Sequence, residues 1–282
     1  KHIENSRSAL PSANTVRKRI EPKKDGEKNL LFAVGFPRSG TTLIDMLLRG
    51  HPRISVLDEK PFVASIALNA LELVNFDYAR LKTLSDRNRS QLKEAYLSAA
   101  HQELGAIPPG DWICDKLPLN IVEAGFIQQI FPDAKFLLIL RHPSDCVFSC
   151  FAQNFRLNSA MASFLNLRDA ANLYDSCFQL WTDAVNILNI DHTEIRYEDV
   201  TKDVAAATQH ICRFLGIEWS EQMLDYQNLA KQQEIHTPSY NQVVQPIYQT
   251  SIGKWRLYEP YWGDDLAALD KWIEYFKYSD LA

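Results

Sequence analysis

Long apolar runs are absent from this sequence. No segment approaches the roughly 18 consecutive apolar residues of a membrane-spanning helix, and no signal-like segment is present. A linker rich in glycine, serine or proline is also missing after residue 28, so one large domain is expected over residues 29–282. With 46% apolar residues, the 282-residue chain has ample material for a core.

Cysteine is scarce, and the five cysteines show neither an even number nor a metal-ligand spacing. A reducing, cytoplasmic compartment therefore fits best. The net charge of −5 is uneven, because residues 1–28 hold eight lysines and arginines against four acids, which leaves −9 for the remainder. This pattern predicts a flexible basic arm or linker over residues 1–28, and it argues against nucleic acid as a partner of the domain.

The most informative stretch is Asn29 to His51. Its apolar run Leu30–Val34 predicts a strand that is buried on both faces. The run ends at Gly35, the loop Phe36–Thr42 follows, and an apolar pattern of helical period comes next. In this order a strand, a glycine loop and a helix direct backbone N–H groups at one point, which suits a phosphate group. The alternative is a glycine turn that only joins a strand to a helix.

The spacing Gly35-x4-Gly40-x-Thr42 is that of a Walker A loop with one departure. The lysine that reaches the β- and γ-phosphates is missing, and Thr41 stands in its place. Since the nearest fixed cation is Arg38, inside the loop, a nucleotide without a γ-phosphate fits better than ATP.

Other apolar segments predict an α/β fold, with a P-loop-like parallel sheet flanked by helices. Strands are expected over Ile54–Leu57, Trp112–Lys116, Lys135–Leu140 and 192–199, and helices over 62–104 (two or three), 121–130, 144–155, 166–189 and 203–215. The strands would deliver Asp58-Glu59, Lys116 and Arg141 to the edge where the glycine loop lies. Paired acids such as Asp58-Glu59 are also ordinary charges of a helix start. From Glu234 onward the chain reads as an irregular, aromatic-rich loop.

Phe36–Thr42 resembles the 5′-phosphosulfate loop of the sulfotransferases that use 3′-phosphoadenosine 5′-phosphosulfate (PAPS) and release adenosine 3′,5′-bisphosphate (PAP). The resemblance covers roughly residues 29–260 and implies the sulfotransferase fold. It implies that the loop residues cradle the 5′-phosphate, and that Arg141 and Ser149, in Arg-His-Pro-x5-Ser, hold the 3′-phosphate. The loop residues concerned are Arg38, Ser39, Gly40, Thr41 and Thr42.

The chain is most similar to the protein-tyrosine sulfotransferase branch, which includes bacterial sulfotransferases with tetratricopeptide repeats upstream. That resemblance allows for a repeat domain before Lys1. It makes Glu59, twenty-one residues after Arg38, the general base, and it places Lys116 on the transferred sulfonate. It also assigns Ser239 and Lys254, fifteen residues apart, to a C-terminal loop, and Tyr197 to a late strand near the nucleotide.

Two departures from that branch bear on the acceptor. The arginines that grip acidic peptides are replaced by Pro61 and Ser65, so an acidic peptide fits poorly. Of the branch's disulfide-forming positions only Cys114 is a cysteine, facing Val56, which argues against an oxidised, lumenal form.

The sequence therefore predicts sulfuryl transfer from PAPS to an acceptor hydroxyl, which a tyrosyl, carbohydrate or small-molecule acceptor could supply. Arg38, Lys116 and Ser239 would neutralise charge on the transferred group, Glu59 would take the acceptor proton, and no metal would be required. One alternative is a P-loop kinase, with Asp115 as a candidate Mg²⁺ ligand. Another is a non-catalytic nucleotide-binding scaffold.

Overall fold

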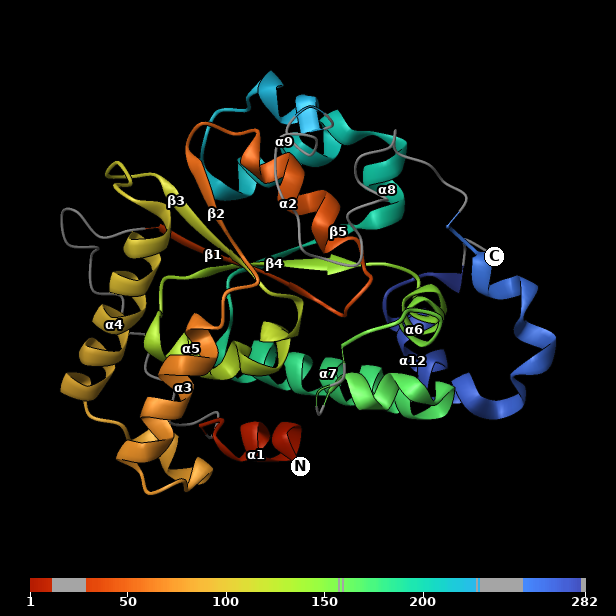
Figure 1. The fold of residues 1–282 in the computed structure, drawn as a ribbon, viewed down its shortest axis with the longest axis horizontal. Coiled ribbons are helices and arrows are strands. Elements are labelled where there is room, and N and C mark those ends of the chain that lie inside the picture. Colours follow the sequence, from red (N-terminus) through yellow and green to blue (C-terminus); the bar gives the residue numbers. More distant parts are fainter. Residues whose placement is uncertain (12–28, 157, 159, 227, 229–250, 280–282) are drawn as a thin grey trace. The chain divides into compact units, whose positions relative to one another are not determined.

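The computed structural model describes residues 1–11, 29–156, 158, 160–226, 228 and 251–279. Its strands and helices alternate along most of the chain (Figure 1). In chain order, with η for 3₁₀ helices, the elements are α1 (His2–Ser8), β1 (Asn29–Gly35), α2 (Thr41–Arg49), β2 (Ile54–Asp58), α3 (Phe62–Leu73), η2 (Tyr78–Thr83), α4 (Asp86–Leu104), β3 (Trp112–Lys116), η3 (Pro118–Glu123), α5 (Ala124–Ile130), β4 (Lys135–Leu140), α6 (Pro143–Phe151), η4 (Met161–Leu165), α7 (Leu167–Leu188), β5 (His192–Arg196), α8 (Tyr197–Lys202), α9 (Val204–Leu215), η5 (Glu221–Asp225), η6 (Lys254–Leu257), η7 (Glu259–Tyr261), η8 (Gly263–Leu269) and α12 (Asp270–Tyr275).

The strands form one five-stranded parallel sheet in the order β2-β3-β1-β4-β5, which confirms the predicted α/β fold. β3 pairs in parallel with both neighbours, and its last residue, Lys116, lies opposite Asp58 on one side and Ala33 on the other. The same register sets Val56 opposite Cys114, as expected.

Tertiary contacts divide the chain into two compact units. The first comprises Lys1–Val34, His51–Leu138 and Gln179–Thr193, and the second comprises Gly35–Gly50, Ile139–Phe178 and Glu194–Ala282. β4, β5 and α7 each run from one unit into the other along the chain. The predicted boundary between an arm and a domain at residue 28 stays a prediction, because residues 12–28 lie outside the described part.

The core of the first unit is built around aromatic rings from β1, β4 and the helices. Phe32 is fully buried and stacks on Phe136 with ring centroids 5.5 Å apart. Phe131 and Tyr96 approach the same ring at 6.0 and 6.1 Å. Beside this core α3 and α4 pack against each other (Figure 1). Since both faces of β1 are buried, the apolar run predicted its environment correctly.

The N-terminal residues differ from the predicted flexible arm. His2–Ser8 forms α1, where Arg7 pairs with Asp183 at 3.1 Å and His2 with Glu123 at 2.6 Å. The residues that follow explain this packing: Ala9 and Leu10 are 4% and 9% exposed. Two apolar side chains anchor the segment in spite of its polar composition.

Helix ends follow local capping chemistry. α4 begins after Ser85, whose hydroxyl accepts a hydrogen bond from the Asn88 amide at 3.2 Å. α9 ends at Gly216, which has a left-handed φ of 69°. Pro143 opens α6, which ends at Phe151, whereas the helix was expected over 144–155.

Other segments also differ from their predictions. The helix expected over 121–130 begins only at Ala124, because Pro118 starts a 3₁₀ turn that occupies the preceding residues. The C-terminal aromatic segment, expected to be irregular, forms η6, η7, η8 and α12 over its described part. Its rings pack onto α6, where Phe148 meets Tyr258 at 4.7 Å and Trp262 at 5.4 Å.

Replacing Phe32 with alanine should lower the free energy of unfolding by about 3–5 kcal/mol, because a cavity would replace the ring that three aromatics contact. Urea unfolding would measure this as a lower midpoint with an unchanged slope. Phe76→Ala is the matched control, since Phe76 is 60% exposed. An equal loss for both variants would contradict the assignment of the core.

Candidate functional site

The loop after β1 contains left-handed backbone conformations at Arg38, with a φ of 70°, and at Gly40, with a φ of 101°. The Ser39 amide closes the turn by donating to the Phe36 carbonyl at 3.1 Å. A Cβ atom at Gly40 would lie 2.5 Å from Cδ2 of Tyr197. Glycine is therefore needed here both for its φ and for the close approach of the tyrosine ring.

The N-terminus of α2 follows directly, with Thr41 and Thr42 both buried. Gly40 occupies the N-cap position and makes no side-chain cap. Among the described residues, the buried Ser39 Oγ has no hydrogen-bond partner. Because buried hydroxyls and helix N-termini both need acceptors of their hydrogen bonds, this loop has the donors that an anion would satisfy.

Arg141 follows β4 and is 8% exposed. Its Nη1 donates to the Arg38 carbonyl at 3.2 Å and its Nη2 to the Ser251 carbonyl at 2.5 Å, while the guanidinium lies 5.1 Å from the ring centre of Tyr197. Within the described part of the chain its buried Nε has no hydrogen-bond partner. Besides these carbonyl partners, Asp145 Oδ1 lies 3.9 Å from Nη2 in a longer ion pair. The unpartnered Nε is the donor that an added anion could use.

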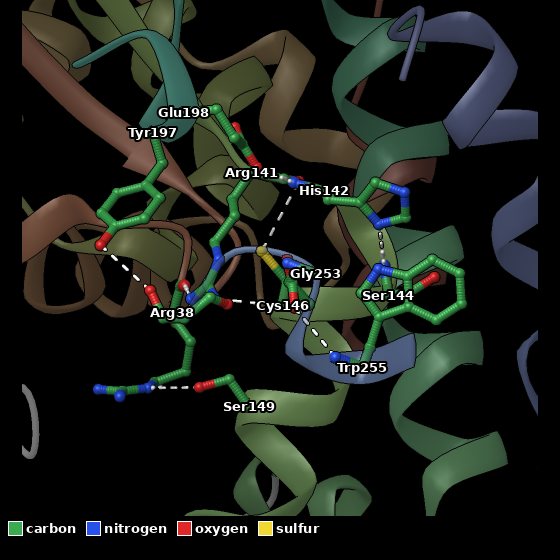
Figure 2. A network of polar contacts seen from close by, with 12 residues as sticks. Arg38, Arg141, His142, Ser144, Cys146, Ser149, Tyr197, Glu198, Gly253 and Trp255 are labelled. Atoms are coloured by element: carbon green, nitrogen blue, oxygen red, sulfur yellow. Dashed lines mark hydrogen bonds and ion pairs between the residues drawn. The ribbon is translucent and has the colours of Figure 1, made fainter. Parts of the chain in front are cut away.

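Figure 2 shows how these contacts join into one network. Arg38 Nε donates to Ser149 Oγ on α6 at 3.1 Å, and the Tyr197 hydroxyl lies 3.4 Å from Ser251 Oγ. We call Arg38, Arg141, Ser149, Tyr197 and Ser251 the phosphate-loop cluster. Tyr197 reaches it from the first residue of α8, not from the strand where it was predicted, because β5 ends at Arg196.

Asp145 organises the same region but was not among the predicted site residues. It is 1% exposed and accepts hydrogen bonds from the amides of Gly253, at 2.7 Å, and Trp255, at 3.4 Å. Burial raises the pKa of this carboxyl group. It lies on α6 four residues after Arg141, a helical spacing that could have pointed to it.

Glu198 is a second such carboxylate. Its Oε1 accepts a hydrogen bond from the His142 amide at 2.9 Å, and its Oε2 accepts one from the Tyr278 hydroxyl at 3.1 Å. Burial raises its pKa as well. Because Glu198 is the neighbour of Tyr197, these bonds fix the start of α8 and with it the tyrosine ring over Gly40.

His142 is neutral and structural. Its Nδ1 accepts a hydrogen bond from the Ser144 amide at 3.3 Å, which caps α6, and its ring stacks on Trp255 with centroids 5.1 Å apart (Figure 2). Burial, together with the charges of Arg256 and Arg141, lowers the pKa of His142 from 6.5 to about 4. The ring therefore carries no charge at neutral pH.

A second cluster lies in the first unit, at the ends of β2 and β3. The Lys116 side chain is 0% exposed, and its Nζ lies 2.5 Å from Asp58 Oδ1 and 3.0 Å from Glu59 Oε1. Glu59 is the more open carboxylate, with 39% of its side chain exposed. We call Asp58, Glu59 and Lys116 the carboxylate–lysine cluster. The structure thus joins Glu59 and Lys116, two residues that were assigned to the same chemistry.

Asp115 has its own partners. It is fully buried, and its Oδ2 accepts a hydrogen bond from the Tyr96 hydroxyl at 2.8 Å while its Oδ1 accepts one from the Asn120 amide group at 3.2 Å. Burial raises the pKa of Asp115 to about 7, against the opposing effects of the Tyr96 hydrogen bond and the Lys116 charge. Both oxygens are used internally, so this carboxylate is poorly placed to bind Mg²⁺.

The remaining predicted residues are distributed differently. Ser239 lies outside the described residues. Lys254 is exposed at the start of η6, between the anchored residues Gly253 and Trp255. All five cysteines, including Cys146 and Cys150 on α6, are buried and free. In the described part of the chain no helix is long and apolar enough to cross a membrane.

An α/β protein with a glycine loop after its central strand falls in the class of phosphate-binding folds. A sequence profile of the Sulfotransferase family matches residues 31–221. That match spans more than half of the chain, and the protein belongs to the sulfotransferase family.

Several relatives in this family are protein-tyrosine sulfotransferases. Protein-tyrosine sulfotransferase 2 of Gallus gallus is 24% identical over 257 residues, 84% of this chain and 65% of that protein. Protein-tyrosine sulfotransferase 1 of Homo sapiens is 24% identical over 250 residues, with 80% and 63% covered. An uncharacterized protein of Aquifex aeolicus is 26% identical over 251 residues, with 87% and 33% covered. The chain thus spans between 33% and 65% of the length of these relatives.

Solved structures show the same fold. The sulfotransferase domain of the curacin biosynthetic pathway aligns with a TM-score of 0.57 at 16% identity, covering 87% of this chain and 97% of that one. The sulfotransferase domain of the olefin synthase of Synechococcus PCC 7002 gives 0.55 at 17% identity, with 84% and 90% covered. A mouse sulfotransferase complexed with PAP gives 0.50 at 18% identity, with 91% and 87% covered.

The pKa of His142 leads to a prediction about acid stability. Between pH 6.5 and about 4 the unfolded chain takes up a proton at this histidine and the folded protein does not. The free energy of unfolding should therefore decrease by up to about 3 kcal/mol as the pH is lowered through this range. His142→Asn keeps a capping side chain and should flatten this dependence in urea titrations at several pH values. His2→Asn is the control: Glu123 raises the pKa of His2, so removing it should change the dependence in the opposite sense. An unaltered profile for His142→Asn would contradict the assignment.

Proposed function

We propose that this chain transfers the sulfuryl group of PAPS to an acceptor hydroxyl. The observation that carries the proposal lies in the phosphate-loop cluster and the neighbouring Ser39: Arg141 Nε and Ser39 Oγ are buried and have no hydrogen-bond partner among the described residues, so an added anion could satisfy both. The loop from Arg38 to Thr42 would hold the 5′-phosphate, and Arg141 with Ser149 the 3′-phosphate. Membership of the sulfotransferase family, and a PAP-bound structure within the fold, support this choice of nucleotide.

The transfer itself would be a direct in-line displacement. The acceptor oxygen forms a bond to sulfur, the bond from sulfur to the bridging oxygen breaks, and the 5′-phosphate leaves with the electron pair. Glu59 takes the acceptor proton. Lys116 and Arg38 stabilise the negative charge on the sulfonate and the bridging oxygen. Ser239 and Lys254 keep their assigned roles as predictions.

We further propose that Glu59 and Lys116 act together, because both lie at one end of the paired strands of the first unit. Lys116 lies in register with Ala33, only two residues before Gly35, where the glycine loop begins. Asp58, which precedes Glu59, lies in register with Lys116. The pairing of the strands therefore supports a common role for the base and the lysine.

The acceptor remains a tyrosyl, carbohydrate or small-molecule hydroxyl. Pro61 and Ser65 are exposed at the positions where protein-tyrosine sulfotransferases carry arginines, so no cation at either position would attract an acidic peptide. A cytoplasmic location and an upstream repeat domain belong to the same proposal. The kinase alternative is weakened because Asp115 is engaged by Tyr96 and Asn120.

The nucleotide preference can be measured by thermal unfolding with PAP, ADP and Mg²⁺-ATP. At 100 times Kd, PAP should stabilise the protein by about 2.7 kcal/mol, a shift of several degrees. Arg141→Lys keeps a charge but loses the fork, so the shift with PAP should fall towards that with ADP. Arg213→Lys, on the exposed face of α9, is the control. Stabilisation by Mg²⁺-ATP alone would overturn the proposal in favour of a kinase.

The assigned base predicts a kinetic defect. Glu59→Gln should lower kcat about 10²–10⁴-fold and leave the PAP-induced thermal shift unchanged, because proton abstraction is lost while the nucleotide contacts remain. PAP release would be assayed with phenolic, tyrosyl-peptide and sugar acceptors. Glu103→Gln, a nearby surface carboxylate that pairs with Lys60 at 2.7 Å, serves as the control. Full activity of Glu59→Gln would exclude it as the base, and wild-type protein inactive with every acceptor would favour the scaffold alternative.

A further inference from the structure

Lys116 has more carboxylate around it than the proposed reaction alone requires. Its ammonium group is buried, and a buried charge is costly unless it is paired. Asp58 approaches to 2.5 Å and Glu59 to 3.0 Å. The nearer carboxylate is therefore not the proposed base but the residue before it.

The backbone explains how two consecutive residues reach one nitrogen atom. In a regular strand neighbouring side chains point to opposite faces. β2 ends at Asp58, and Glu59 then adopts a left-handed φ of 50°, which is unfavourable for a residue other than glycine. Its amide donates to the Lys116 carbonyl at 2.9 Å, which holds this turn against β3. Strain of this kind is typical of functional sites.

The neighbouring charged groups are directed elsewhere. Lys60 pairs with Glu103, and Asp115, on the alternate side of β3, is bound to Tyr96 and Asn120. Lys60 therefore does not share the carboxylates of Lys116 in the described contacts, and Asp115 does not replace Asp58 as its partner.

We propose that Asp58 is a positioning residue, a permanent counter-ion that holds Lys116 charged and in place while Glu59 acts as the base. The inference rests on the proposed function. When the acceptor proton passes to a Glu59 carboxylate oxygen, that group becomes neutral and its attraction for Lys116 is lost. Asp58 keeps its negative charge, so the ammonium group retains an ion-pair partner throughout the displacement. The two carboxylates around Lys116 thereby have separate roles: Asp58 holds the cation, and Glu59 accepts the proton.

The test compares Asp58→Asn, Asp58→Glu and the control Glu103→Gln. Asp58→Asn should lower kcat about tenfold, with the PAP-induced thermal shift changed less than twofold, because PAP lacks the sulfonate that Lys116 would contact. Asp58→Glu restores the charge and should recover part of kcat. If the role of Asp58 were merely structural, the losses of kcat would instead parallel the losses in the unfolding midpoints of the variants. An unchanged kcat in Asp58→Asn, or equal loss in both Asp58 variants, would overturn the proposal.

A second readout does not depend on activity. Amine-reactive labelling followed by peptide mass spectrometry measures how accessible and how free each lysine is. Labelling of Lys116 should rise several-fold in Asp58→Asn, while Glu103→Gln should raise it only at Lys60. If the wild-type protein transfers no sulfuryl group but this pattern is seen, the proposed function fails and the counter-ion role stands. If Lys116 labelling is unchanged, the counter-ion role fails whatever the activity.

Discussion

The structure of the candidate site depends on how two buried cations are paired. Lys116 ends β3 and Arg141 follows β4, and neither can be buried without partners, because an unpaired charge inside a protein is very unfavourable. The chain satisfies them in different ways. Lys116 is held by carboxylates, and Arg141 is held chiefly by backbone carbonyl groups. This difference in partners underlies the different roles proposed for the two clusters.

Arg141 has one carboxylate partner, Asp145 Oδ1, at the longer distance of 3.9 Å, and its buried Nε has no partner among the described residues. Arg141 draws two distant segments together through Arg38 and Ser251, and Asp145 holds the adjoining turn at Gly253. Tyr197 closes on Gly40, where no side chain would fit. The result is a rigid set of hydrogen-bond donors, and rigid donors stabilise a bound anion without reorganising. Such a set suits a nucleotide with phosphates at both its 3′ and 5′ positions.

A cation held by carboxylates is suited instead to chemistry in which a proton moves. Lys116 lies between an aspartate whose side chain is 27% exposed and a glutamate whose side chain is 39% exposed. In the proposed reaction Glu59 accepts the proton and Asp58 preserves the ion pair. Asp115, one residue earlier, shows the contrast: fully buried, with both oxygens satisfied by neutral donors, it serves the core.

Much of the fold and part of the site could be predicted from the sequence. Apolar runs and capping residues determine β1, α2, β4 and the end of α9, because these signals act within a few neighbouring residues. The parallel order of the strands then places their final residues at one edge of the sheet. Only the tertiary structure decided that Asp58 pairs with Lys116, that Asp145 anchors Gly253, and that α1 is packed. These contacts join residues far apart in the chain, so their selection depends on burial and packing that no local pattern encodes.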